Sequence, residues 1–322
     1  MATTRRFDFS LSAGKFFPLF IGFWLPCLLL YALMIIAAIE VQESRPAPES
    51  IWVMLGTFLG LFLLYLFFTI PLMRRILPAL LLEGRPLAFR GSIGRFVGLN
   101  LLGAFLSIIT IGIYAPWYAA RLCRYLASET SYEGRSWAFT GKGGRLFVIL
   151  LLTLVLPITV IAAVIGVLAG LSGGAGSGLL RWLYPILYVL LLFLIPAYMY
   201  EIYRWLFINL RLEELSVRWR TRFWPSFGAI FLQVLLCLVT AGIYLPAAYV
   251  KLYRYFVQRT ELEREGQPYG KLGFDGKAGQ GFLRIWGQAL LTLITVGFYY
   301  PWAMAKIGRW FAGHTTLDTP SA

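Results

Sequence analysis

Histidine occurs once in this sequence, at His314, and cysteine three times, at Cys27, Cys123 and Cys237. The cysteines are far apart and form no C-x-x-C pair, which argues against a disulfide framework or a zinc site. No His, Cys and carboxylate constellation falls within any apolar segment, although most hydrolytic and metal chemistry requires one. We therefore expect no enzymatic activity, no metal and no cofactor.

Charged residues are also scarce, at 14% of the 322 residues, whereas 59% are hydrophobic and 17% aromatic. An average globular domain is about 25% charged and about 45–50% apolar. A chain of this length has no core large enough for so much apolar surface, so the composition excludes a water-soluble monomer. It equally excludes intrinsic disorder. The composition predicts an integral membrane protein.

Acidic residues are outnumbered, 15 Asp and Glu against 29 Lys and Arg, for a net charge of +14. In a soluble protein this excess would favour nucleic-acid binding. Here every basic cluster borders an apolar run, so the charge instead indicates loops held on the cytoplasmic side of a membrane. We expect the bilayer as partner and no nucleic acid.

Apolar runs long enough to cross a bilayer, about 20 residues each, occupy residues 16–39, 51–73, 96–120, 146–171, 183–200, 227–250 and 282–305. Seven crossings would divide the basic residues almost evenly between the two sides. If the third, sixth and seventh runs instead enter and leave on the same side, 27 of the 29 basic residues become cytoplasmic. That bias predicts four spans, three re-entrant or in-plane segments, and cytoplasmic N- and C-termini.

The same three runs share the pattern T-x-G-x-Y-x-P, at residues 110–116, 240–246 and 295–301. Glycine weakens a helix, and proline removes a donor and clashes with the preceding turn but suits the first turn of a new helix. Each run is therefore predicted to be a helix, a break and a second helix. The candidate ligand-binding residues at the breaks are Thr110, Gly112, Tyr114, Pro116, Thr240, Gly242, Tyr244, Pro246, Thr295, Gly297, Tyr299 and Pro301.

Basic residues recur five and eight positions after each proline. The two bases of a copy share a helix face because they are three residues apart. The second base is followed directly by Tyr or Trp, which suits the headgroup region of a bilayer. The candidate lipid head-group ligands are Arg121, Arg124, Lys251, Arg254, Lys306 and Arg309.

A second repeated element, F-x-G-x-x-G, occurs at residues 89–94, 139–144 and 274–279, and residues 9–14 and 223–228 keep its frame without the middle glycine. It favours a turn or short extended segment before each helix. Residues 84–89 (GRPLAF) also resemble residues 134–139 (GRSWAF) fifty positions later. We predict an all-α polytopic fold built by duplication, with repeats at 1–138 and 139–273 and an extra half-repeat at 274–322.

The T-x-G-x-Y-x-P signature with its trailing R-[YW], together with the F-x-G-x-x-G openers, resembles the YjgN-type bacterial inner-membrane proteins, a family of unknown function. The resemblance covers nearly the whole chain. It implies a location in the bacterial cytoplasmic (inner) membrane and no established activity, substrate or catalytic residue. The Pro246-Ala247 pair departs from the Pro-Trp pair of the other two copies.

Two functions remain open from the sequence, with transport as the leading interpretation and a scaffold as the alternative. Gly/Pro-interrupted segments at matching places in repeated halves favour a transporter or channel-like module for a small polar or lipid-derived ligand. The regular basic pairs favour instead a non-transporting scaffold that engages anionic lipid or regulates a membrane partner. No carboxylate lies in the middle of an apolar run, so proton-coupled pumping has little support.

Overall fold

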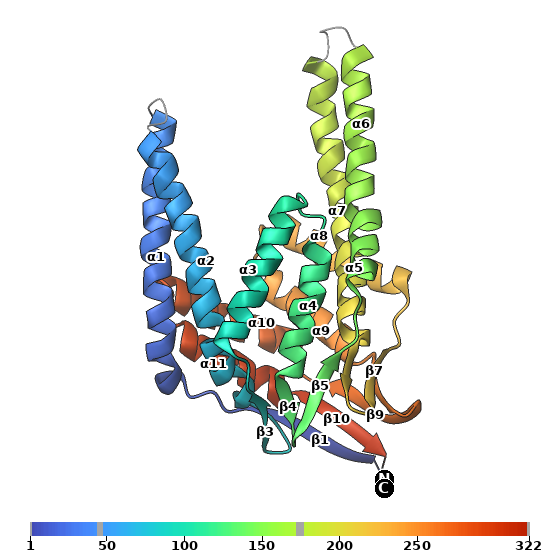
Figure 1. Ribbon diagram of the computed structural model, residues 1–322. Helices are drawn as coiled ribbons and strands as arrows, with labels where there is room; N and C mark the ends of the chain where they lie inside the picture. The colour runs from blue at the N-terminus through green and yellow to red at the C-terminus, as the bar shows by residue number, and fades with distance from the viewer. Residues whose placement is uncertain (1, 44–47, 172–176, 321–322) are drawn as a thin grey trace.

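The structure is a computed structural model that describes residues 2–43, 48–171 and 177–320. Within these residues, ten short antiparallel strands close into a barrel, and helical hairpins rise from one end of it (Figure 1). Around the barrel the order is β1-β10-β9-β8-β7-β6-β5-β4-β3-β2. The strands are β1 (Ala2–Phe9), β2 (Leu80–Leu82), β3 (Arg85–Phe89), β4 (Thr130–Tyr132), β5 (Arg135–Phe139), β6 (Leu210–Leu212), β7 (Leu215–Trp219), β8 (Thr260–Arg264), β9 (Gln267–Phe274) and β10 (Thr315–Pro320).

Tight turns and helical hairpins alternate along the chain. Two-residue turns join β2 to β3, β4 to β5, β6 to β7 and β8 to β9. In the first turn Glu83 and Gly84 both have positive φ, 55° and 75°, and the same holds at 133–134 and 265–266. Two positive φ angles are typical of a type I′ turn, whose twist matches that of the strands it joins. β1 and β10 have no turn between them, so their pairing closes the barrel.

Each turn-linked strand pair is followed by a helical hairpin that returns to the same barrel. The helices are α1 (Ala13–Glu43), α2 (Pro48–Ile76), α3 (Ile93–Ile109), α4 (Ala115–Ser128), α5 (Gly143–Leu150), α6 (Leu156–Leu171), α7 (Ser177–Ile208), α8 (Phe223–Val239), α9 (Leu245–Val257), α10 (Ala278–Ile294) and α11 (Tyr300–Gly313). A π-helical segment, η2 (Leu151–Val155), joins α5 to α6, and a 3-10 turn, η1 (Leu77–Ala79), follows α2. Neighbouring hairpins touch in sequence (α2 with α3, α4 with α5, α7 with α8, α9 with α10), and α11 contacts α1. The hairpins therefore form a closed ring above the barrel.

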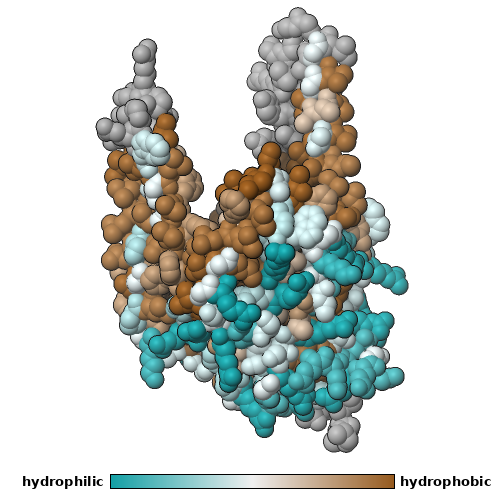
Figure 2. Space-filling view, in the orientation of Figure 1, coloured by the Kyte–Doolittle hydropathy of each residue, from teal (hydrophilic) through white to brown (hydrophobic). Residues whose placement is uncertain are grey.

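Two of the hairpins are much longer than the others (Figure 1). Among the described residues, the four helices long and apolar enough to cross a membrane are 13–39, 51–79, 143–168 and 189–208. They coincide with the first, second, fourth and fifth apolar runs, the four predicted to span. We call these two hairpins, α1/α2 and α5–α6/α7, the spanning hairpins, and α3/α4, α8/α9 and α10/α11 the motif hairpins. Figure 2 shows the apolar surface on the helices and the polar surface on the barrel.

The predicted all-α fold class is wrong, because the barrel is a β-structure. Among the described residues, three of its strands have three residues and four have five. A period of two cannot be recognised over three residues, and the partners β1 and β10 lie at opposite ends of the chain. The extended segment predicted before each helix is the end of a strand.

The repeating unit of the structure is one strand, one helical hairpin and one strand. In every unit, the N–H of the residue after the first strand donates to the carbonyl of the residue before the second. These bonds are Ser10 to Ala79 (2.7 Å), Arg90 to Glu129 (2.9 Å), Thr140 to Asn209 (2.9 Å), Arg220 to Arg259 (2.9 Å) and Asp275 to His314 (3.1 Å). The fourth unit therefore begins its opener at Trp219, four residues before the Phe223 suggested by the sequence. The units are thus shorter than the predicted repeats 1–138 and 139–273, whose boundaries fall at the ends of β5 and β9.

The barrel wall has an apolar face and a polar face. The strand registers set apolar or aromatic residues opposite one another in five cross-strand pairs: Phe7 with Leu82, Leu87 with Tyr132, Trp137 with Leu212, Val217 with Leu262, and Leu272 with Leu317. Two positions further along their strands, the buried Phe9, Phe89, Phe139 and Phe274 belong to separate cores that pack against the helix bases. The opposite face carries ion pairs such as Arg218 with Glu263 at 2.6 Å. The barrel therefore joins the hairpins through its apolar face and presents charge to water.

Candidate functional site

The T-x-G-x-Y-x-P segments form the tips of the three motif hairpins. In the first copy, Ile111 and Gly112 both have positive φ, 50° and 85°. The Gly112 N–H bonds the carbonyl of Ser107 at 2.7 Å, which closes the helix end as in a Schellman motif. The other two copies repeat these angles and this bond. The glycine is thus needed for a reversal of the chain, and the proline sits in the first turn of the returning helix.

The three motif threonines bond within their own turns. The Thr110 hydroxyl donates to the Leu106 carbonyl at 2.7 Å and accepts the Tyr114 N–H at 3.0 Å. Thr240 and Thr295 make the same two bonds. This local capping explains why threonine occupies the position. A ligand role for these hydroxyls stays a prediction, and it would compete with these bonds.

The motif tyrosines hold the first base of each predicted pair. The cationic group lies over the tyrosine ring in all three copies: Arg121 over Tyr114 (5.6 Å), Lys251 over Tyr244 (5.3 Å) and Lys306 over Tyr299 (5.5 Å). Such cation–π contacts hold a cation beside an apolar surface. The tips beyond them are apolar and exposed, with Ile111 93% exposed and Ile294 76% exposed. The first bases therefore lie between an apolar tip and the polar barrel.

The second base of each pair is placed differently in the three copies. Arg254 donates to the carbonyl of Gly276, in the opener of the next unit. Arg309 donates to the Ala305 carbonyl of its own helix at 3.2 Å. Arg124 lines a cavity. The three equivalent second bases therefore differ in role: Arg254 and Arg309 bond backbone carbonyls, whereas Arg124 lines a cavity.

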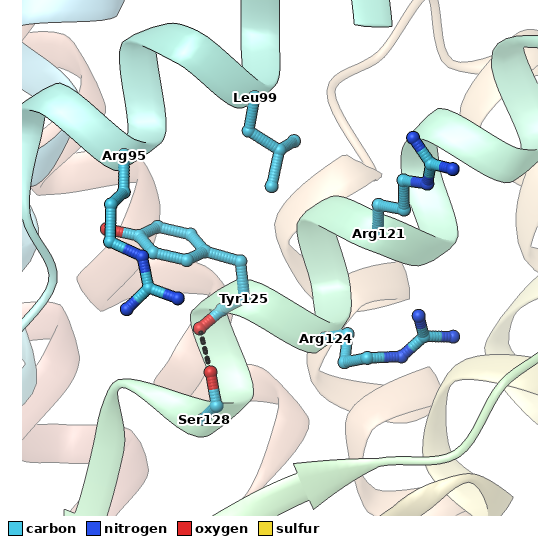
Figure 3. Close-up of a pocket in the computed structure, with 6 residues that line it drawn as sticks. All are labelled: Arg95, Leu99, Arg121, Arg124, Tyr125 and Ser128. Atoms are coloured by element: carbon cyan, nitrogen blue, oxygen red, sulfur yellow. Dashed lines mark hydrogen bonds between the residues drawn. The ribbon is translucent and has the colours of Figure 1, made fainter.

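The cavity lies between α3 and α4 and has a volume of about 360 Å³. Figure 3 shows Arg121 and Arg124 extending in the same direction from α4, with Arg95 on α3 and Leu99 above. The six lining residues are Arg95, Leu99, Arg121, Arg124, Tyr125 and Ser128. Arg95 pairs with Glu129 at 3.0 Å and lies over the Tyr125 ring. The cavity is thus basic on several sides.

Tyr125 lines this cavity and is anchored to the start of α3. Its hydroxyl donates to the Ser92 carbonyl at 2.7 Å. Burial raises the pKa of the Tyr125 phenol above its ordinary value, and the bond to Ser92 opposes part of that effect. The phenol therefore stays protonated and keeps its donor role at neutral pH.

The sequence pattern predicted Arg121 and Arg124 as site residues but not Arg95, Leu99, Tyr125 and Ser128. A signal for Arg95 was present, because it lies six residues after the opener Phe89, as Lys15 and Arg145 lie six residues after Phe9 and Phe139. Among the described residues, no group of three or more His, Cys, Asp and Glu side chains is placed to hold a metal ion.

The sequence matches a family described as bacterial proteins of unknown function, DUF898, over residues 84–183, 145–271 and 269–321. Together these matches cover most of the chain. The chain belongs to this family. It is also similar to the inner membrane protein YjgN of Salmonella typhimurium (strain LT2), with 33% identity over 70 residues. No solved structure matches the chain.

The match to YjgN covers 22% of this chain and 18% of that protein. Together with the four candidate spans, it supports an inner-membrane location for this DUF898 protein, as the sequence predicted. The cavity between α3 and α4 falls inside the first of the three family matches.

Proposed function

We propose that this DUF898 protein is a non-transporting, non-enzymatic scaffold of the inner membrane that engages anionic phospholipids on the cytoplasmic side. The observation that carries the proposal is the placement of one base over the motif tyrosine in all three motif hairpins. A base near an anionic bilayer surface contributes about 1 kcal/mol. The barrel, with its polar outer face, lies in the cytoplasm, and the chain binds the membrane through its hairpins.

The topology belongs to the same proposal. The spanning hairpins cross the bilayer, and the motif hairpins enter the cytoplasmic leaflet and return. Their helices support this, because α3 has 17 residues and α4 has 14. At 1.5 Å per residue both are shorter than the hydrocarbon thickness of about 30 Å. Because every hairpin returns to one barrel, both termini lie on its side of the membrane.

Cysteine labelling tests this topology. On a background without Cys27, Cys123 and Cys237, we expect Ser136→Cys on β5 to react with an impermeant maleimide only from the cytoplasm. Ser44→Cys and Ala175→Cys, between the helices of the spanning hairpins, should react only from the periplasm. Labelling after permeabilisation is the control for reactivity. Reaction of Ser136→Cys in intact spheroplasts would contradict the topology.

Lipid-dependent stability tests the function. In neutral detergent, added phosphatidylglycerol should raise the unfolding temperature by several degrees over phosphatidylcholine of the same chains, because a ligand at 100 times its Kd stabilises by about 2.7 kcal/mol. The variant Arg121→Gln/Lys251→Gln/Lys306→Gln should lose most of that difference. Its charge-matched control is Arg85→Gln/Arg135→Gln/Arg218→Gln on the barrel. Equal responses of the two triple variants would rule out the motif bases as the lipid contact.

Transport of a small polar or lipid-derived ligand is the second candidate. Gly/Pro-broken helices at corresponding places in repeated units support it, as does the closed ring of hairpins. Against it, the threonine hydroxyls at the breaks already bond within their turns. We therefore rank it below the lipid-engaging scaffold.

A further inference from the structure

The α3/α4 hairpin departs from the other two motif hairpins at its tip. In those hairpins the motif tyrosine donates to a glutamine of the first helix, Tyr244 to Gln233 at 3.1 Å and Tyr299 to Gln288 at 3.0 Å. The corresponding residue of α3 is Gly103. The Tyr114 hydroxyl is consequently buried with no hydrogen-bond partner among the described residues.

Arg124 also departs from its counterparts. The same repeat position, six residues before the returning strand, holds Arg74, Arg124, Arg204, Arg254 and Arg309. Arg74 donates to the Gly91 carbonyl at 2.7 Å, and Arg254 makes the equivalent bond to Gly276. Arg204 approaches Glu201 at 4.0 Å, and Arg309 bonds Ala305. Within the described residues, no hydrogen bond or ion pair engages the Arg124 guanidinium.

Both departures involve residues that line the cavity or contact a lining residue. Arg124 lines it without a partner, and Arg121 beside it contacts the ring of the unsatisfied Tyr114. Where the other copies of a repeat satisfy a polar side chain locally and one copy does not, the exception indicates a functional position. Two guanidinium groups on one helix face match the geometry of phosphate oxygens, which arginine binds through paired N–H donors.

The net charge of the lining residues indicates the charge of a ligand that fits this cavity. Three arginines line it, and Glu129 neutralises Arg95 through the 3.0 Å ion pair. Two positive charges, on Arg121 and Arg124, remain uncompensated by the side chains described there. Leu99 supplies an apolar wall towards the tip of the hairpin.

We propose that the α3/α4 cavity binds one phosphate head group that carries two negative charges. A phosphomonoester fits this description because its second pKa is about 6, so it is close to doubly charged at neutral pH. This proposal names a ligand class for the proposed function. It rests on that function in one respect, because it takes the phosphate to come from a membrane lipid. A soluble phosphomonoester offers the same chemistry.

Competition for a fluorescent short-chain phosphatidic acid in neutral detergent tests this site in the full-length protein. We expect unlabelled phosphatidic acid to compete at least about tenfold better than phosphatidylglycerol, the difference that one charge-assisted contact supplies. Arg124→Gln should weaken phosphatidic acid binding about tenfold. Arg121→Gln/Arg124→Gln should abolish it. The matched control is Arg204→Gln, at the same repeat position in a spanning hairpin, and should bind as the parent does.

Arg124→Gln also keeps misfolding from obscuring the test, because within the described residues the Arg124 side chain has no hydrogen bond or ion pair to lose. Thermal unfolding of the variant checks this. Equal competition by phosphatidylglycerol would overturn the two-charge ligand and leave the proposed lipid function standing. Full binding by the double variant would overturn the site itself. Competition by glycerol phosphate as strong as by the lipid would support the phosphate chemistry and identify a soluble source.

Discussion

Truncation of the chain before Thr315 should leave no folded protein in detergent. The truncation removes β10, which pairs with β1 from Ala2↔Pro320 to Arg6↔Thr316 and with β9 from Thr315↔Phe274 to Asp318↔Lys271. It also removes Leu317, which is 4% exposed. Two ladders are lost at once, and β1 and β9 become open edges prone to aggregation. The loss is comparable with the about 5–15 kcal/mol that stabilises a typical domain.

Size-exclusion chromatography of the detergent-solubilised protein measures the result. The control truncation ends at Pro320 and should elute as the full chain does. A second control moves the chain ends without removing a strand: a circular permutant that starts at Gly84 and links residue 320 to residue 2. Because Ala2 of β1 pairs with Pro320 of β10 (Figure 1), the permutant should fold. A monodisperse peak from the chain truncated before Thr315 would show that β1–β10 pairing does not close the fold.

The helical hairpins of this fold could be predicted from the sequence, because their signals are local. Long apolar runs identified the candidate spans, and the positions of Arg and Lys separated them from the motif hairpins. The barrel could not be predicted in this way. Its shortest strands, such as β2 and β4, have three residues, and the pairing that closes it joins Arg6 to Thr316. Such contacts leave no pattern within a sequence window.

The candidate site was predicted in part for a similar reason. Arg121 and Arg124 stood out because their spacing from Pro116 recurs in two other hairpins. The regular spacing did not show that the second bases Arg124, Arg254 and Arg309 make different contacts. Arg254 bonds a carbonyl of the next unit, whereas Arg124 faces a cavity. The structure places the fourth opener at Trp219, so the units can be aligned residue by residue. In that alignment Arg124 is the exception among the equivalent arginines, because it faces a cavity.

The second prediction with a large effect on stability concerns the contact between α4 and α5. A Cβ on Gly143 would lie 2.6 Å from the Cα of Trp117 and 2.8 Å from its ring, closer than atoms can approach. Because the nearest atom belongs to the backbone, no side-chain rotation relieves the contact. Overpacking typically costs about 1–3 kcal/mol, and we expect Gly143→Ala to lie at the upper end of that range.

The neighbouring glycine supplies a matched control for this prediction. A Cβ on Gly144 meets no atom within 4 Å, and alanine is a better helix former than glycine by about 1 kcal/mol. In detergent, Gly143→Ala should therefore lower the unfolding temperature by several degrees, whereas Gly144→Ala should leave it unchanged or raise it. Equal unfolding temperatures for the two variants would mean that α4 does not pack on α5 at Trp117. The ring of hairpins would then be open at this seam, next to the helix that carries Arg121 and Arg124.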